Sequence, residues 1–262
     1  MNKIILALDK IKEEIDDTIE VELSKKQTFA GVNTLKIKAL KDTDLEIIYE
    51  EDEIKYDIYV ELLPKINVNI YEQKQKGSYK LSYHYNLNEL SKANIYKVND
   101  AKKIKESITI NLNGKEAKAS FLLKTISKNE EKYDIMVYHK ASQTESCIIT
   151  NGVNIKKGKL EFNVSGFVPK GIKECIVNQN NRIINLTDEV SQIRPNLFID
   201  ENNVIANHSA HIGKCNENEM FYLMSRGITA KNAENLIVKG FLTSGLEYYK
   251  QLMEKIINKY WN

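Results

Sequence analysis

Residues 54–60 read Ile54-Lys55-Tyr56-Asp57-Ile58-Tyr59-Val60, so apolar and polar side chains alternate strictly along this stretch. A period of two predicts a β-strand with one buried and one exposed face, and Ile, Val and Tyr suit a pleated surface. The same alternation recurs at 35–39, 46–49, 66–70, 79–85, 107–112, 118–123 and 133–139. The middle of the chain is therefore predicted to be a long all-β region.

Beyond His139 the strand patterns become shorter and the turn signals closer. Asn151-Gly152 and Asn180-Asn181 follow short apolar runs and are typical of turns. No helical pattern interrupts the strands before Asn216. Many short strands fit either an antiparallel sandwich or a solenoid whose coils each contribute a few strands. Because no exact repeat is visible, the pattern leaves these two architectures open.

The N-terminal segment has a different period. Ile4, Leu8, Ile11 and Ile15 are spaced by four, three and four residues, and charged residues occupy the other face. This spacing predicts an amphipathic helix within residues 1–24.

Helical signals return at the C-terminus. Asn216 suits a helix start, and Gly227 stands where a helix-ending glycine belongs. Thr229 is placed to cap a second helix, and Ser244-x-x-Glu247 is a capping box for a third. The chain is thus predicted to contain a helix, a long β region and a helical tail.

Composition excludes several classes of partner. The 262 residues carry 38 Lys and Arg against 36 Asp and Glu, which gives no reason to expect nucleic acid as a partner. No stretch approaches the roughly 20 apolar residues that span a membrane. Three widely separated cysteines without a Cys-x-x-Cys motif are expected of a reduced, cytoplasmic protein. The segment 152–159 is similar to a P-loop, but Leu160 replaces the Ser or Thr that binds magnesium.

Two C-terminal stretches carry the most specific pattern in the chain. One reads Val204-Ile205-Ala206-Asn207-His208-Ser209-Ala210-His211, and the other reads Met220-Phe221-Tyr222-Leu223-Met224-Ser225-Arg226-Gly227-Ile228. Together they resemble the C-terminal part of the SufB/SufD family, the scaffold subunits of the SUF iron–sulfur cluster assembly machinery. Weaker elements follow the family's order upstream, among them Ile110–Gly114 and Pro195–Ile199, so the resemblance covers residues 55–246.

The resemblance implies a right-handed parallel β-helix and so favours the solenoid over the sandwich. The expected chain is mainly β, with an N-terminal helix at 1–24, a β-helix core at 25–214 and a C-terminal helical segment at 215–262. Family members are not enzymes themselves; they bind the SUF ATPase, SufC, through the C-terminal helices and pair through their β-helices. The resemblance therefore implies a non-enzymatic scaffold that docks a SufC-like ABC ATPase and forms a homodimer, or a heterodimer with a related scaffold.

One short run matches the family's docking helix. A helix that is apolar on more than one face is either buried within its own chain or binds a partner. Aromatic residues and arginine are common interface anchors, and with the resemblance they favour docking of the ATPase. The predicted partner-binding residues are Phe221, Tyr222, Leu223, Arg226 and Gly227.

His208 matches a family histidine implicated in cluster formation, and Glu189 stands where SufB members have a cysteine. The resemblance implies a transient iron–sulfur cluster, with His208 and Glu189 as candidate metal ligands and with thiolates from a partner chain. The alternatives are a histidine bonded within a turn and a solvated glutamate. Loss of the cysteine leaves open a paralogue that binds the ATPase without a cluster. An enzyme on the same fold, such as a lyase or acyltransferase, would need acids or bases clustered on one face.

Overall fold

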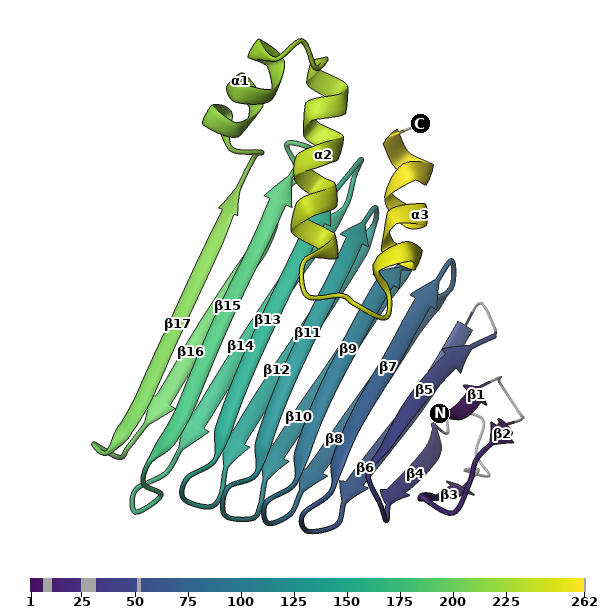
Figure 1. The fold of residues 1–262 in the computed structure, drawn as a ribbon, viewed down its shortest axis with the longest axis vertical. Helices are drawn as coiled ribbons and strands as arrows, with labels where there is room; N and C mark the ends of the chain where they lie inside the picture. The colour runs from purple at the N-terminus through teal and green to yellow at the C-terminus, as the bar shows by residue number, and fades with distance from the viewer. Residues whose placement is uncertain (7–10, 25–31, 51–52, 262) are drawn as a thin grey trace.

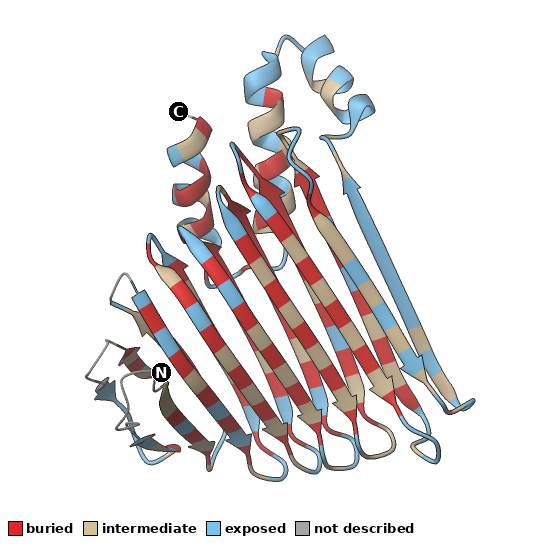
Figure 2. Ribbon diagram, turned by 180° about the vertical axis from the view of Figure 1, so that it is seen from behind, coloured by how far each residue is buried: buried red, intermediate tan, exposed pale blue. Residues whose placement is uncertain are grey.

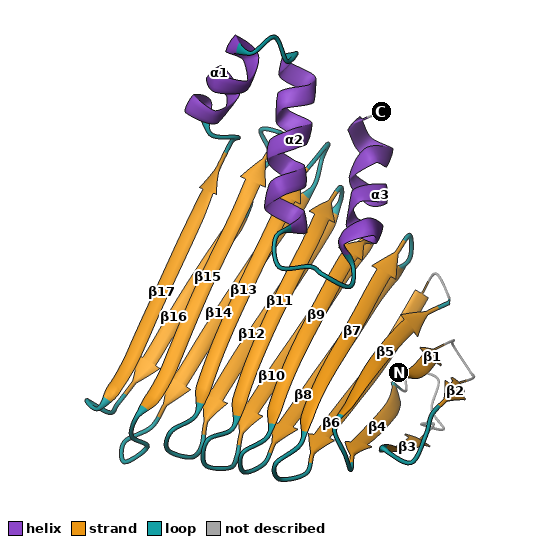
Figure 3. Cartoon of the chain, viewed as in Figure 1, coloured by secondary structure: helices purple, strands orange, loops and turns teal. Residues whose placement is uncertain are grey.

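Two β-sheets lie face to face and are wound from a single chain (Figure 1, Figure 3). A computed structural model describes residues 1–6, 11–24, 32–50 and 53–261. Within most of each sheet, neighbouring strands are parallel and in register, and successive strands alternate between the sheets. The result is a β-solenoid of about seven turns, followed by helices. The predicted parallel β-helix is confirmed over the antiparallel sandwich.

The strands of sheet A are β1 (Asn2–Leu6), β2 (Ile11–Glu14), β5 (Thr43–Tyr49), β7 (Asn67–Gln75), β9 (Lys92–Asp100), β11 (Lys118–Ser127), β13 (Glu145–Asn154), β15 (Cys175–Asn185) and β17 (Val204–Gly213). The strands of sheet B are β3 (Ile19–Ser24), β4 (Asn33–Ala39), β6 (Glu53–Leu62), β8 (Ser78–Leu87), β10 (Lys103–Leu112), β12 (Glu130–His139), β14 (Lys159–Val168) and β16 (Gln192–Ile199). The helices are α1 (Glu217–Ser225), α2 (Ala230–Thr243) and α3 (Lys250–Trp261).

Each coil of the β-helix consists of one strand of sheet A and the next strand of sheet B. In-register pairing stacks equivalent residues of successive coils, as Ile70, Ile95 and Phe121 show. Inward and outward side chains alternate along most of the described strands, and the inner columns are filled mainly by aliphatic and aromatic residues. Each fully buried side chain of this kind contributes about 1.5–3 kcal/mol, so the stacked columns supply most of the stabilisation.

One turn is repeated between successive coils. Five non-glycine residues adopt a left-handed backbone conformation at this turn. They are Lys65, Leu90, Glu116, Gln143 and Glu174, with φ between 58° and 67°. The N–H group of each donates to a carbonyl of the next coil, as Lys65 does to Glu89 at 2.8 Å and Leu90 to Lys115 at 2.9 Å. These inter-coil bonds offset the cost of the left-handed conformation.

The predicted N-terminal helix is wrong, because the described parts of this segment form β1, β2 and β3. Strand β1 pairs in parallel with β5, and Ile4 and Leu6 are buried in the inner core. Ile15 is exposed, and Leu8 lies outside the described residues. The free edge of β5 offers backbone partners and a core surface, and this tertiary contact outweighs the local helical spacing.

The turns predicted at Asn151-Gly152 and Asn180-Asn181 are also wrong, because both dipeptides lie inside strands. A Cβ atom on Gly152 would lie 2.2 Å from a side-chain carbon of Leu160, so close packing explains this glycine. Asn181 is buried and accepts a hydrogen bond from Thr150 Oγ1 at 2.8 Å. Residue types that are common in turns are therefore used here inside strands, Gly152 for close packing and Asn181 for a buried hydrogen bond.

The first two helices of the C-terminal segment begin where the sequence predicts. Asn216 and Thr229 cap α1 and α2, and Gly227 has φ +83°. The third helix starts later than predicted, since Ser244 is the C-cap of α2 and Gly245 takes φ +75°. Helices α2 and α3 pack on the outer face of sheet A (Figure 1). No helix in the described part of the chain has the length and apolarity that crossing a membrane requires.

Candidate partner-docking site

Helix α1 is fixed at both ends by its own sequence. The side chain of Asn216 accepts hydrogen bonds from the N–H groups of Asn218 and Glu219 at 2.9 and 3.2 Å. At the other end, the N–H of Gly227 donates to the carbonyl of Met224 at 3.0 Å. These caps satisfy backbone groups that a helix of nine residues would otherwise leave free.

None of the nine residues of α1, all of which the structure describes, is buried (Figure 2). The side chains of Phe221 and Tyr222 are 75% and 58% exposed, although both are large and aromatic. Leu223 is half-buried and Met224 is exposed. The described residues therefore do not bury this run, which was the alternative left open by the sequence.

An apolar groove of about 550 Å³ runs between α1 and α2. Tyr222 and Leu223 form one wall, and Leu236 and Ile237 form the other. Leu236 is 48% exposed, so the groove adds apolar surface next to the aromatic face of α1. A contiguous apolar surface of this kind is typical of a protein-interaction site.

Arg226 and Gly227 end α1 and also shape its surface. The N–H group of Arg226 donates to the carbonyl of Leu223 at 3.1 Å. Its guanidinium lies 5.3 Å from the centre of the Tyr222 ring, within the range of a cation–π contact. The five residues predicted for docking therefore lie on one exposed helix or directly after it, where Arg226 contacts the ring of Tyr222 and Gly227 helps to end the helix.

Helices α2 and α3 are held firmly on the β-helix, in contrast to α1. The buried carboxylate of Asp100 accepts a hydrogen bond from Lys259 Nζ at 2.7 Å and another from the hydroxyl of Tyr260, both in α3. Lys124 Nζ donates to the carbonyl of Phe241 in α2 at 3.1 Å. Helix α1 thus extends from a base that is fixed to sheet A.

His208 lies in β17, which ends sheet A, and it is paired with Gln179 of β15. Its position continues an inner column that passes through Ile95, Phe121 and Ile148. Because no further strand of the described chain covers β17, the imidazole is exposed rather than enclosed. A second chain stacked on this end would meet His208 directly.

The structure does not bring Glu189 to His208. Glu189 is exposed in the segment between β15 and β16, whereas His208 lies in the middle of a strand. Among the described residues, no group of three or more His, Cys, Asp or Glu side chains is placed to hold a metal ion. Burial, together with Glu234 and Glu219, raises the pKa of Cys215 to about 11, which disfavours a metal-binding thiolate there.

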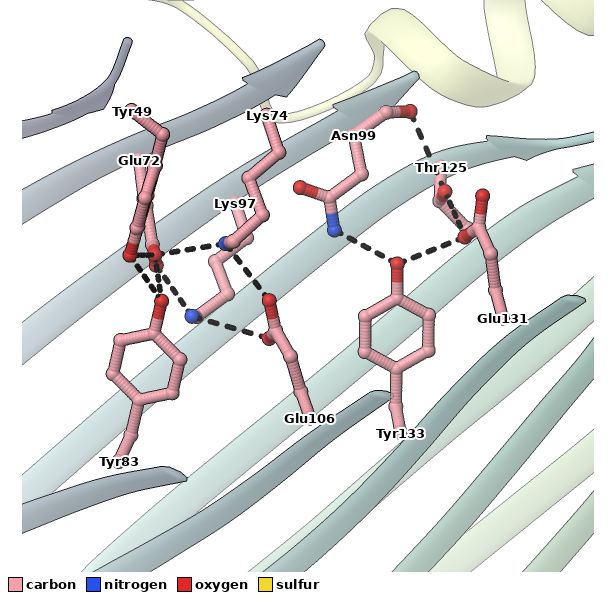
Figure 4. A network of polar contacts seen from close by, with 10 residues as sticks. All are labelled: Tyr49, Glu72, Lys74, Tyr83, Lys97, Asn99, Glu106, Thr125, Glu131 and Tyr133. Atoms are coloured by element: carbon pink, nitrogen blue, oxygen red, sulfur yellow. Dashed lines mark hydrogen bonds and ion pairs between the residues drawn. The ribbon is translucent and has the colours of Figure 1, made fainter. Parts of the chain in front are cut away.

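Ten polar residues form two adjacent groups of hydrogen bonds and ion pairs inside the β-helix, one around Glu72 and Glu106 and one around Glu131 (Figure 4). We call them the interior polar network: Tyr49, Glu72, Lys74, Tyr83, Lys97, Asn99, Glu106, Thr125, Glu131 and Tyr133. At its centre, Lys74 Nζ lies 2.8 Å from a carboxylate oxygen of Glu72 and 2.8 Å from one of Glu106. Lys97 pairs with the same two carboxylates, and none of the four side chains is exposed to solvent.

Burial opposes the ionisation of Glu72, but the lysines outweigh it and lower the pKa of this carboxyl to about 2. The strand predicted at 66–70 stops just before Glu72, so these polar residues were not predicted to lie in the interior. The signal was the continued period of two, which places Ile70, Glu72 and Lys74 on the same inner face.

Residues 55–241 match the family model described as SUF system FeS cluster assembly, SufBD core domain. The match covers more than half of the chain and includes most of the β-helix, all of α1 and nearly all of α2. The chain belongs to the SufBD family. The resemblance predicted from the two C-terminal stretches is thereby confirmed.

Several proteins of the SufBD family are similar to parts of this chain. The iron–sulfur cluster assembly protein SufD of Bacillus subtilis is 30% identical over 148 residues, which are 55% of this chain and 34% of that protein. A SufBD family protein of Staphylococcus epidermidis is 30% identical over 134 residues, 49% of this chain and 28% of the relative. The matched regions thus span about a third or less of the relatives' length.

Proposed function

We propose that this SufBD family chain is a non-enzymatic scaffold subunit of a SUF-type iron–sulfur cluster assembly complex. In this proposal it docks a SufC-like ABC ATPase through α1. The observation that carries the proposal is that α1 has exposed aromatic side chains and no buried residue, and lies beside an apolar groove. Similarity to SufD of Bacillus subtilis, an iron–sulfur cluster assembly protein, supports the assembly role. Unpaired cysteines fit a complex that works in the reducing cytoplasm.

The exposed aromatic residues of α1 and the apolar side chains of the adjacent groove together have the composition of an interface centre. Phe221 and Tyr222 offer large apolar surfaces with few rotatable bonds, and Leu236 of α2 extends that surface. The caps at Asn216 and Gly227 hold α1 in place before binding, so little ordering entropy is lost when a partner docks. An apolar segment of the ATPase that enters the groove is the partner surface that fits.

The open end of the β-helix supports pairing of two scaffolds, either identical or related. Strand β17 ends sheet A, and its ten residues include no Lys, Arg, Asp or Glu. Ile205 and Ile212 on this strand are 59% and 40% exposed. Uncharged edge strands with exposed apolar side chains pair readily with another strand.

The iron–sulfur cluster would be cargo handled where two chains meet. His208 at the open end is the residue of this chain that such a pairing would enclose. One chain alone does not gather a ligand set among its described residues, so thiolates would have to come from the other chain. Glu189 remains a weaker candidate, because it lies apart from His208 in a solvated segment.

Co-purification with the cognate ABC ATPase tests the docking proposal. The Tyr222→Asp variant is expected to lose the ATPase, with an affinity reduced roughly a hundredfold, because a carboxylate would be desolvated in the interface. Tyr248→Asp is the matched control, since Tyr248 is also an exposed tyrosine and follows α2 rather than lying on α1. Equal retention of the ATPase by both variants would refute docking through α1.

A second candidate function is a paralogue that binds the ATPase but carries no cluster. The lack of a gathered ligand set in the described chain favours it. Anaerobic reconstitution of the purified complex with iron and sulfide separates the two candidates. Uptake of iron that depends on His208 supports the scaffold, whereas a complex that takes up none supports the paralogue.

A further inference from the structure

The middle coils of the β-helix have nearly the same number of residues. Ile47, Glu72 and Lys97 stack in one column and are each 25 residues apart in sequence. Later coils differ, since Thr150 and Asn181 stack at a separation of 31 residues. Where coil lengths are equal, one coil could loop out and the next take its place without stretching any turn. Length therefore does not define the coil register between β5 and β9, and the step from β9 to β11 is only one residue longer.

The outer faces do not define this register either, because neighbouring coils repeat the same residues. Three pairs of stacked identical residues lie on the outer face of sheet B: Lys80 and Lys105, Ser82 and Ser107, and Asn86 and Asn111. Asn69 and Asn94 form a similar pair on sheet A. If the coil β7–β8 looped out, the coil β9–β10 would present these same residues to the coil before it. If the coil β9–β10 looped out, Lys80 would still lie opposite a lysine, Lys132.

The interior differs from coil to coil at these positions. Glu72 and Lys97 occupy a column that holds Ile47 before them and Leu123 after them. Apolar residues thus fit the same inner positions in adjacent coils. Burial of four charges here has a desolvation cost that aliphatic side chains would avoid.

Every junction between these coils has its own polar link (Figure 4). The hydroxyl of Tyr49 in β5 contacts Glu72 in β7. Lys74 of the coil β7–β8 reaches Glu106 of the coil β9–β10 at 2.8 Å. Asn99 of that coil donates to the hydroxyl of Tyr133 in the next coil at 2.8 Å.

Each buried ion has one partner in its own coil and one in the neighbouring coil. Lys74 pairs with Glu72 within its strand and with Glu106 across the junction. Lys97 pairs with Glu106 within its coil and with Glu72 across the junction. If the coil β9–β10 looped out, Glu72 would stack on Leu123 and would lose its second lysine. The mismatch would leave a buried carboxylate under-compensated.

We propose that the interior polar network selects the coil register of the β-helix by penalising slipped stacking of equal-length coils. Its role is specificity of the fold rather than net stability, since apolar residues at the same positions would pack without the desolvation cost. Correct register in turn places α1 and the open end at β17 in their native positions.

Cysteine reporters in the full chain can distinguish the two registers. Asn69 and Asn94 lie side by side, with their amides 2.8 Å apart, so Asn69→Cys with Asn94→Cys reports native stacking. Ser120 lies one coil further, about 10 Å from Asn69, too far for a disulfide unless the coil between them is looped out. Asn69→Cys with Ser120→Cys thus reports slipped stacking. Both reporters carry Cys147→Ser, because Cys147 is the neighbour of Ser120.

The reporters are refolded from urea, oxidised and mapped by mass spectrometry. In a variant with Glu72→Leu, Lys74→Met, Lys97→Met and Glu106→Leu, slipped cross-linking is expected to rise roughly tenfold while native cross-linking falls. The pair Lys74→Met with Glu106→Leu removes one junction link and is expected to give an intermediate increase. With the network intact, native cross-links should dominate.

Tyr85→Phe is the matched control. It removes a buried hydroxyl that has no hydrogen-bond partner among the described residues, and so should leave the register unchanged. If both network variants give only native cross-links, the network does not select register. A variant that fails to fold at all overturns the proposal equally, because it would assign the network to stability.

Discussion

Glu131 lies in the interior polar network, where Thr125 and Tyr133 donate hydrogen bonds to one carboxylate oxygen at 2.6 and 2.8 Å. Burial raises its pKa from 4.5 to about 7, against the effect of those two hydrogen bonds. Between these values the folded protein holds a proton that the unfolded chain has released. The stability that this proton represents is therefore complete below pH 4.5 and is lost as the pH rises to about 7.

Glu131→Gln removes this titration while preserving the size of the side chain. Relative to the variant, the wild type is expected to lose on the order of 3 kcal/mol of unfolding free energy between pH 4.5 and pH 8. Urea unfolding of both proteins across this range measures the difference.

The adjacent Glu130 provides the control for this experiment. It is exposed, and its hydrogen bond with Lys103 lowers its pKa, so it does not titrate in the same window. The Glu130→Gln and wild-type curves should run parallel. Parallel curves for Glu131→Gln as well would show that Glu131 is not protonated in the folded protein.

At the scale of elements, the buried carboxylate of Asp100 joins the C-terminal end of α3 to sheet A, beside the buried side chains of Ile257 and Trp261. Asp100 pairs with Lys128 and Lys259 and accepts from Tyr260. Burial and the bond to Asp100 raise the pKa of Tyr260, so its hydroxyl stays protonated and donates. Nearer the start of α3, Tyr249 is buried against sheet A and donates to Glu46 at 3.3 Å.

Asp100→Asn should loosen the last turns of α3 without unwinding the β-helix. The cost is expected to be on the order of 2 kcal/mol, because Lys128 is mostly buried and would lose its charge partner. Hydrogen exchange is expected to speed up for amides near Tyr260 and to stay unchanged in β9. Lys255→Met, an exposed residue of the same helix, should alter neither region. Uniform acceleration across the chain would contradict a local anchor.

The elements predicted correctly are those with strong local signals. The strand at 54–60 was predicted from the alternation of apolar and polar residues, and the helix starts were predicted from the caps Asn216 and Thr229. Both signals depend on neighbouring residues alone, and the structure confirms them. The prediction of an N-terminal helix was wrong because Ile4 stacks on Ile47 in an inner column that exists only in the folded chain. Such a surface is built from residues far apart in sequence, so local periodicity does not reveal it.

The candidate site divides in the same way. The exposure of Phe221 and Tyr222 followed from a helix that is apolar on several faces, read together with the family resemblance. The burial of Glu72 and Lys97 could not be predicted in this way, because charged residues in a strand normally indicate a face exposed to solvent. Their burial depends on the stacking of coils 25 residues apart, which a local reading of the strands does not detect.

At the scale of the whole molecule, the edge strands at the two ends of the β-helix differ in pairing and in charge, and β17 is exposed along most of its length (Figure 2). The N-terminal end finishes in antiparallel pairs, and its outermost strands β2 and β3 carry several charged residues. Charged edges discourage further pairing. The C-terminal end finishes in two parallel edge strands: β17 of sheet A has no Lys, Arg, Asp or Glu, and β16 of sheet B has one charged residue, Arg194. One end is thus protected by charge, and the other is suited to adding a strand.

Ile205→Lys with Ile212→Lys is expected to block pairing at the C-terminal end, because lysines on an edge strand repel the same lysines of a second copy. The dissociation constant of the pair should rise at least about tenfold, measured by sedimentation over a concentration series. Both side chains are exposed, so the unfolding free energy of the single chain should change by less than about 0.5 kcal/mol. Leu90→Lys is the matched control, since Leu90 is an exposed turn residue whose counterpart one coil earlier is Lys65. Unchanged pairing in the double variant would place the interface elsewhere on the molecule, whereas a loss that occurs equally in Leu90→Lys would point to general charge repulsion rather than to β17.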